Sequence, residues 1–180
     1  LPAFFRPAGV IRRALVLGVG GGAVIRLLHH CIQPAQIIGV ELDPTHIYIA
    51  RRFFGVTERR ADLIEADAHA WLRRYRGPKF DLIVDDVFGE SEGEPVRAIE
   101  ADRAWLATLA RHLADDGVLV MNFISMRMLR EAGAAVTVVG LGASNYALED
   151  HSIGCADVSI EEVTDRPFDG VVIPGGLGPE

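Results

Sequence analysis

The chain of 180 residues is long enough for one domain with a full hydrophobic core and short for two. Apolar residues make up 49% and charged residues 24%, a balance that is typical of a folded protein and excludes an intrinsically disordered one. The net charge of −7 argues against broad binding to nucleic acid or anionic membranes, whose phosphates it would repel, and it permits a small cationic ligand.

The sequence contains no apolar run of membrane-spanning length and no recognisable signal peptide, so we expect a cytoplasmic protein. The two cysteines, Cys31 and Cys155, form no spacing motif. We therefore expect neither a disulfide framework nor a metal site.

Short apolar runs alternate with helical patterns from Ala14 onward. Their apolar character predicts buried strands at 14–18, 36–42, 61–67, 80–86 and 118–124. Helical spacing and caps predict helices that contain Val24 to Cys31, that follow Asp43-Pro44, that span 68–75, and that include Ile99, Leu106, Leu109 and Leu113. This alternation predicts an α/β fold, a single doubly wound and mainly parallel sheet with helices on both faces.

Ligands of such sheets bind beyond the carboxyl ends of the strands, near the switch in strand order. The first predicted strand ends in "GVGGGA", where Gly18, Gly20 and Gly22 allow a tight turn and a close approach to a ligand. The second ends at Glu41, whose carboxylate can accept hydrogen bonds from both hydroxyls of a ribose. Alternatively, the turn is purely structural and Glu41 is a surface acid.

The third and fourth predicted strands also end in acids. Asp67, followed by the small Ala68, suits an adenine ring with the carboxylate accepting from the exocyclic amine, and it equally suits the N-cap of the next helix. Asp85 and Asp86 end the fourth strand as candidate ligand-facing acids or as solvated loop acids. Because all four strand ends carry a glycine cluster or an acid, their coincidence favours a ligand site.

The glycine turn with an acid about twenty residues on is also the fingerprint of dinucleotide-binding proteins. Two features favour S-adenosylmethionine or its decarboxylated form over NAD. A sulfonium cofactor has no pyrophosphate, and it gains from nearby carboxylates that would repel a dinucleotide's phosphates.

The segments "ALVLGVGGGAVIRLL", "IIGVELDP", "IEADAHAWL", "FDLIVDDVFGESEGEPV" and "LARHLADDGVLVMNF" together resemble the spermidine synthase-like branch of the class I methyltransferase fold, over about residues 10–125. The resemblance implies that the Gly18–Gly22 loop holds an adenosyl cofactor, with Glu41 on the ribose and Asp67-Ala68 on the adenine. It also implies that Asp86 serves the reacting amine.

The sequence departs from that family at two positions. Gly21 stands where the family's loop carries an aspartate that holds the amine of the cofactor, and Gly89 stands at the second aspartate of the "DSSD" signature. The absence of the aspartate at Gly21 puts polyamine chemistry in doubt. Three glutamates, Glu90, Glu92 and Glu94, follow Asp86 and form either an acidic lid that attracts a cationic amine or a solvated flexible loop.

The last third follows a different pattern. A strand is expected at 135–141, and 145–148 suits the return strand of a methyltransferase sheet. Residues 129–180 also resemble the PfpI-type amidotransferase-like family, but Cys155 does not lie where that family has its catalytic cysteine. We expect one α/β domain over 1–180, with a cofactor-binding core at 10–125 and a segment at 126–180 that completes the sheet and is either native to the fold or a fused fragment.

The sequence thus predicts an adenosyl-cofactor-binding transferase in which Asp86 orients or deprotonates an acceptor. Gly18, Gly20, Gly22, Glu41, Asp67, Ala68 and Asp85 would bind the cofactor. A methyltransferase for small molecules and a non-catalytic adenosyl-binding or structural domain are the alternatives. The expected partner is a small-molecule substrate, with no nucleic acid and no membrane, and the fold is compatible with a homodimer.

Overall fold

The computed structural model describes residues 10–123 and five short strands farther along the chain. The first two thirds contain, in chain order, β1 (Arg13–Leu17), α2 (Ala23–Cys31), β2 (Gln36–Glu41), α3 (Pro44–Arg52), β3 (Asp62–Glu65), α4 (Ala68–Arg74), β4 (Phe80–Asp85), β5 (Phe88–Ser91), β6 (Glu94–Arg97), α5 (Arg103–His112) and β7 (Leu113–Phe123). The later strands are β8 (Val139–Gly140), β9 (Asn145–Ala147), β10 (Ile153–Cys155), β11 (Val158–Ser159) and β12 (Gly170–Pro174).

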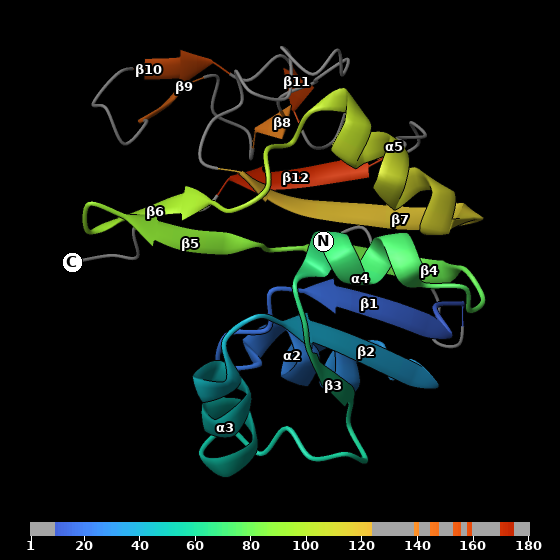
Figure 1. Cartoon of the computed structure of the whole chain (residues 1–180). Helices are drawn as coiled ribbons and strands as arrows, with labels where there is room; N and C mark the ends of the chain where they lie inside the picture. The colour runs from blue at the N-terminus through green and yellow to red at the C-terminus, as the bar shows by residue number, and fades with distance from the viewer. Residues whose placement is uncertain are drawn as a thin grey trace.

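Six strands form one sheet in the order β12-β7-β4-β1-β2-β3 (Figure 1). Every pairing within this sheet is parallel. The chain passes from β1 to β2 and β3 on one side and then crosses to β4 and β7 on the other. The strand order therefore switches between β1 and β4, and the predicted doubly wound parallel sheet is confirmed.

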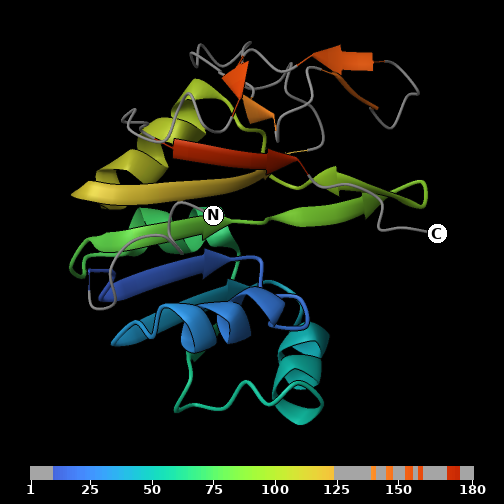
Figure 2. The same ribbon diagram turned by 180° about the vertical axis from the view of Figure 1, so that it is seen from behind.

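The helices cover both faces of the sheet because successive strand residues point to opposite sides. Ala14 and Val16 of β1 belong to the core cluster that includes Ile25 and Leu28 of α2. The intervening Leu15 and Leu17 belong to a second cluster, whose helical members are Ala68, Leu72, Trp105 and Leu109. Accordingly, α4 and α5 lie in front of the sheet in Figure 1, and α2 lies in front when the molecule is seen from behind (Figure 2).

Aspartates begin three of the helices at the positions expected from N-cap preferences. The carboxylate of Asp43 accepts from the backbone N–H of Thr45, with Pro44 at the first helical position of α3. Asp67 caps α4 and Asp102 caps α5 in the same way. These caps fix the points at which the chain leaves the sheet.

Two expectations for the later part of the chain need correction. Helix α5 ends at His112, and β7 begins at once, so Leu113 belongs to the strand. The pairing of β7 with β4 jumps from Leu113 to Val118, so β7 begins with an irregular part before residue 118, where the strand was expected to start. The backbone of β9 pairs with β10 outside the main sheet, which excludes residues 145–147 as its return strand.

In the described C-terminal strands, β12 extends the central sheet beside β7. Residues 135–138 of the expected strand lie outside the described residues, and 139–140 form β8. The division at about residue 125 stays a prediction. Among the described residues, the helices are too short or too polar to cross a membrane.

Candidate functional site

The glycine turn between β1 and α2 needs glycine at three positions. Gly18, Gly20 and Gly22 have φ angles of 79°, 49° and 79°, which residues with a side chain rarely adopt. A Cβ on Gly18 would lie 2.1 Å from the carbonyl oxygen of Asp86, and one on Gly22 would lie 2.5 Å from Val56 Cγ2. At Gly20 a Cβ would have no neighbour within 4 Å among the described residues. Gly18 and Gly22 therefore serve packing, whereas Gly20 presents open backbone.

Glu41 at the end of β2 is tied directly to this turn. Its Oε2 accepts from the backbone N–H groups of Val19 and Gly20, each at 2.9 Å, and its Oε1 accepts from that of Asp43 at 3.0 Å. His46 Nδ1 lies 3.6 Å from Oε1. A carboxylate has about four acceptor positions. Three are used here, which leaves about one for a ribose hydroxyl where the sequence suggested two.

The electrostatic setting of Glu41 favours the charged form. Burial of the side chain acts to raise its pKa, but the three backbone donors and His46 outweigh burial, and the pKa lies below its ordinary value. Glu41 is therefore a carboxylate at neutral pH that organises the glycine turn from the carboxyl end of β2.

At the end of β3, the prediction that Asp67 caps the next helix is confirmed. Asp67 Oδ1 accepts from the N–H of Ala70 at 2.7 Å, and the side chain is exposed. Ala68 is buried in the first turn of α4. Nearby, Leu42 follows Glu41 and is 65% exposed, and the N–H of Ala66 donates to the carbonyl oxygen of Glu41. Leu42 is thus an exposed apolar side chain between the ends of β2 and β3, which the sequence analysis did not single out.

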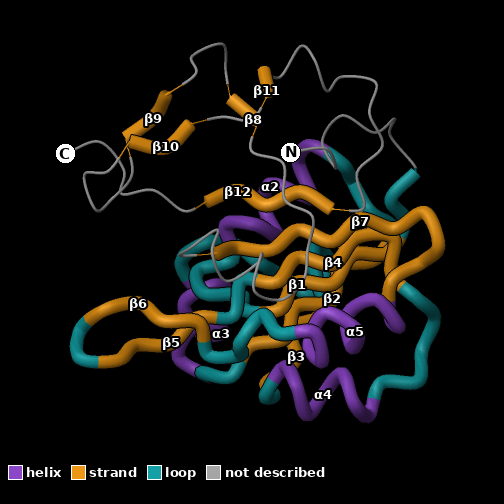
Figure 3. The backbone as a smooth tube through the Cα atoms, turned by 90° about the horizontal axis from the view of Figure 1, so that it is seen from above, coloured by secondary structure: helices purple, strands orange, loops and turns teal. Residues whose placement is uncertain are grey.

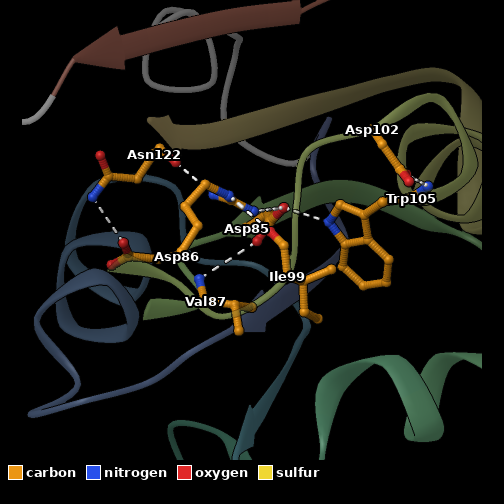
Figure 4. Close-up of polar contacts among 8 residues, drawn as sticks. Asp85, Asp86, Val87, Ile99, Asp102, Trp105 and Asn122 are labelled. Carbon is orange, nitrogen blue, oxygen red and sulfur yellow. Dashed lines mark hydrogen bonds and ion pairs between the residues drawn. The ribbon is translucent and has the colours of Figure 1, made fainter. Parts of the chain in front are cut away.

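Asp86 lies at the switch point. Its N–H donates to the carbonyl oxygen of Leu17 at 2.8 Å, which places it against the start of the glycine turn. Its half-buried carboxylate accepts a hydrogen bond from Asn122 Nδ2 at 2.9 Å, so the ends of β1, β4 and β7 meet at this residue (Figure 4).

Asp85, directly before it, has a different environment. Its side chain is fully buried on the α5 side of the sheet, where Oδ2 accepts from Trp105 Nε1 and Arg97 Nη2, both at 2.7 Å (Figure 4). Burial raises the pKa of Asp85 and outweighs the opposing effects of Arg97 and Trp105. These contacts favour a positioning role for Asp85 over the predicted contact with a cofactor.

The segment after Asp86 is a β-hairpin, so its interpretation as a flexible loop is wrong. Strands β5 and β6 pair antiparallel around a two-residue turn at Glu92-Gly93, whose φ angles are 55° and 86°. Figure 3 shows the hairpin extending beyond the central sheet. Glu90 and Glu92 are exposed on it, so the acidic-lid hypothesis remains open as a prediction.

The side-chain partners of the two aspartates could not be read from motifs, because Arg97, Trp105 and Asn122 belong to none. The available signal was Arg97, the first basic residue after the acids that follow the fourth strand, together with Trp105, because a buried guanidinium and a buried Trp N–H both require an acceptor.

The chain matches the model of the spermine/spermidine synthase domain over residues 2–141 and that of the DJ-1/PfpI family over residues 112–180. It is 30% identical over 126 residues to a polyamine aminopropyltransferase of Vibrio vulnificus, covering 68% of this chain and 41% of that protein. It is also 28% identical over 120 residues to the eEF1A lysine and N-terminal methyltransferase of Mus musculus, covering 61% of this chain and 17% of that protein. The chain spans less than half the length of these relatives.

Two solved structures have similar folds. Human methyltransferase-like protein 13 in complex with SAH gives a TM-score of 0.53 at 21% identity, covering 66% of this chain and 59% of that chain. Spermidine synthase from Thermotoga maritima gives 0.50 at 21% identity, covering 66% and 38%. The fold is therefore that of the class I methyltransferases, and the chain belongs to the spermine/spermidine synthase domain family.

Proposed function

We propose that this chain is an adenosyl-cofactor-binding transferase that acts on a small cationic amine, with aminopropyl transfer as its reaction. The observation that carries the proposal is the meeting of three groups at the switch in strand order. The glycine turn, the Glu41 carboxylate bonded to it and the half-buried Asp86 all lie at carboxyl ends of neighbouring parallel strands.

The residues at these strand ends fit an adenosyl group. A Cβ on Gly20 would have no neighbour within 4 Å among the described residues, and Glu41 retains about one acceptor position for a ribose hydroxyl. Leu42 supplies an exposed apolar surface for the adenine ring. Asp67 uses Oδ1 to cap α4, so its Oδ2 can accept from the exocyclic amine of the adenine. We assign Ala68 to the adenine side as well, through its backbone.

Asp86 is the residue placed to serve an acceptor. When bound, the adenosyl sulfonium supplies an electrophilic carbon whose C–S bond breaks, with its electrons staying on sulfur, as the acceptor nitrogen forms the new bond. Asp86 would accept a hydrogen bond from the amine, orient its lone pair and take up the proton that the nitrogen loses. The acids Glu90 and Glu92 on the hairpin would raise the local concentration of a cationic acceptor.

Methyl transfer is a second candidate. Gly21 stands where an aspartate would hold the aminopropyl or methionine amine of the cofactor, so this chain lacks an acid that either cofactor would use. The Mus musculus relative is a methyltransferase by name. A chain that retains the turn and Glu41 but lacks this acid would still bind the adenosine half of either cofactor.

Calorimetric titration separates these candidates. Wild type, Glu41→Gln and the surface control Glu58→Gln are titrated with S-adenosylmethionine, its decarboxylated form, methylthioadenosine and NAD. We expect the adenosyl ligands to bind wild type and the control equally. They should bind Glu41→Gln at least about tenfold more weakly, because this variant loses a charge-assisted hydrogen bond. Preference for the decarboxylated form supports aminopropyl transfer, and preference for the intact cofactor supports methyl transfer. Binding of NAD alone, or of none of the four ligands, would refute the proposal.

A further inference from the structure

The carboxylate of Asp86 is fixed from two sides. Its backbone is bonded to Leu17 and packs against Gly18, where even a Cβ would not fit. Its Oδ1 accepts from Asn122 Nδ2 at 2.9 Å, across from the end of β7. Because a carboxylate only accepts hydrogen bonds, the amide of Asn122 must present its NH₂ group here. One acceptor position of Oδ1 is thereby used, and Oδ2 accepts no hydrogen bond among the described residues.

Asn122 is itself held by a buried cation. The guanidinium of Arg97 donates to the backbone carbonyl oxygen of Asn122 at 2.5 Å, to Asp85 Oδ2 at 2.7 Å and to the carbonyl oxygen of Ile99 at 3.1 Å. The side chain of Arg97 is only 2% exposed. Since its planar donors point in fixed directions, these bonds tie the backbone at Asn122 to the end of β4, beyond the last ladder pair at Asp85 and Met121. They hold Asn122 where its side chain reaches Asp86.

A solvent-accessible carboxylate does not need such a partner for stability. Water satisfies half-exposed acids, and an isolated surface hydrogen bond contributes little to folding. A hydrogen bond that selects one carboxylate orientation matters where the other oxygen must meet a reacting group, because small displacements of such a group reduce rates steeply.

We propose that Asn122 is a positioning residue for Asp86: the Asp86–Asn122–Arg97 contacts, anchored on Asp85, turn one carboxylate oxygen toward the acceptor amine. The inference rests on the proposed function, since it presupposes an acceptor at Asp86. It adds the residue that orients the carboxylate. It also explains why a buried arginine at the base of the β5–β6 hairpin reaches the end of β7.

The test uses Asn122→Leu, which keeps the size and removes the donor, and Asn122→Asp, which keeps the shape but replaces the amide donor by a second carboxylate beside Asp86. Gln36→Leu is the control for loss of an amide side chain away from the site, where β2 begins: Gln36 Nε2 donates to Asp62 Oδ2 at the same 2.9 Å, and its Oε1 accepts from Arg13 Nη1. Each variant is measured for methylthioadenosine affinity, for putrescine affinity in the methylthioadenosine complex, and for kcat and KM of putrescine aminopropylation. Crystal structures give the orientation of Asp86.

We expect methylthioadenosine affinity to stay within about twofold of wild type in all three variants, because Asn122 makes no contact with the glycine turn among the described hydrogen bonds. In both Asn122 variants, putrescine affinity should fall about tenfold and kcat about 10- to 100-fold, with the Asp86 carboxylate rotated. The control should match wild type.

Three results would overturn the inference. The first is an Asn122→Leu variant that equals the control in putrescine affinity and kcat, and the second is an Asn122→Asp variant that equals wild type, because the amide donor is then not required. Wild type that binds methylthioadenosine but not putrescine would leave Asp86 without an amine to position, and it would retain the cofactor half of the proposed function. Absence of adenosyl binding in wild type would instead refute the proposed function itself.

Discussion

Replacement of single glycines by alanine separates the packing and ligand roles within the turn. Gly18→Ala forces alanine to a φ of 79° and brings its Cβ to 2.1 Å from the carbonyl oxygen of Asp86. Gly20→Ala meets a comparable backbone strain, at a φ of 49°, with open space around its Cβ. The strain costs about 1–2 kcal/mol in either variant. The overlap at Gly18 adds about 1–3 kcal/mol, since backbone must move.

The expected loss in free energy of unfolding is therefore about 2–5 kcal/mol for Gly18→Ala and about 1–2 kcal/mol for Gly20→Ala. Alanine also stiffens the unfolded chain, but this gain is common to both variants and cancels in their difference. Urea unfolding at neutral pH measures the two values. Equal destabilisation would refute the close approach of Gly18 to Asp86.

For ligand affinity we expect the opposite order, with a larger loss in Gly20→Ala than in Gly18→Ala. Gly20→Ala places a methyl group on the open side of the turn, so we expect methylthioadenosine affinity to fall about tenfold in a variant that remains folded. Unchanged affinity in Gly20→Ala would show that the ligand does not approach this backbone. It would also redirect the search for the cofactor to another part of the carboxyl edge.

Three further predictions test charges and the missing acid. The pKa of Glu41 is lowered in the folded protein, so its carboxylate stabilises the fold at pH values above its ordinary pKa near 4.5, and acidification removes this stabilisation. The difference in free energy of unfolding between wild type and Glu41→Gln, measured by urea unfolding, should therefore shrink as the pH falls below about 4.5. Arg97→Met leaves Asp85 buried without its cation, so unfolding should become easier by about 3–5 kcal/mol at pH 7. Because burial raises the pKa of Asp85, the folded state binds the extra proton, and this variant should gain stability as the pH falls from 7 to 5; a constant stability there would contradict the burial argument. Gly21→Asp restores the acid for a cofactor amine, and its Cβ meets Phe54 Cε2 at 3.3 Å, which a small shift of that exposed ring relieves. Calorimetry should show a larger gain for decarboxylated S-adenosylmethionine than for methylthioadenosine, which lacks the amine, and equal changes would exclude Gly21 as the amine position.

The fold and the positions of the acids could be predicted because both depend on local pattern. Continuous apolar runs such as Ala14 to Leu17 specify buried parallel strands. Because the carboxyl ends of parallel strands lie at the same edge of a sheet, Glu41, Asp67 and Asp86 were expected along that edge. The cap at Asp67 was also predictable, because it needs only a backbone N–H three residues on.

The environment of each acid could not be predicted, because it depends on contacts between distant residues. Asp85 and Asp86 are adjacent and alike in sequence, yet Arg97 and Trp105 surround one while Asn122 meets the other. The hairpin was missed for a related reason. Its two-residue turn at Glu92-Gly93 lies among glutamates, which do not indicate a hairpin turn, and its base is held by the buried Arg97.

The hairpin joins a fixed base to an exposed tip. Arg97 fastens the base to the sheet, whereas Gly93 at the tip has no neighbour within 4 Å of a Cβ among the described residues. Mutations that lengthen, shorten or recharge the tip therefore leave the framework of the sheet untouched. A laboratory library confined to residues 90–93 can therefore vary the charge and length of the tip while the chain keeps its ability to fold.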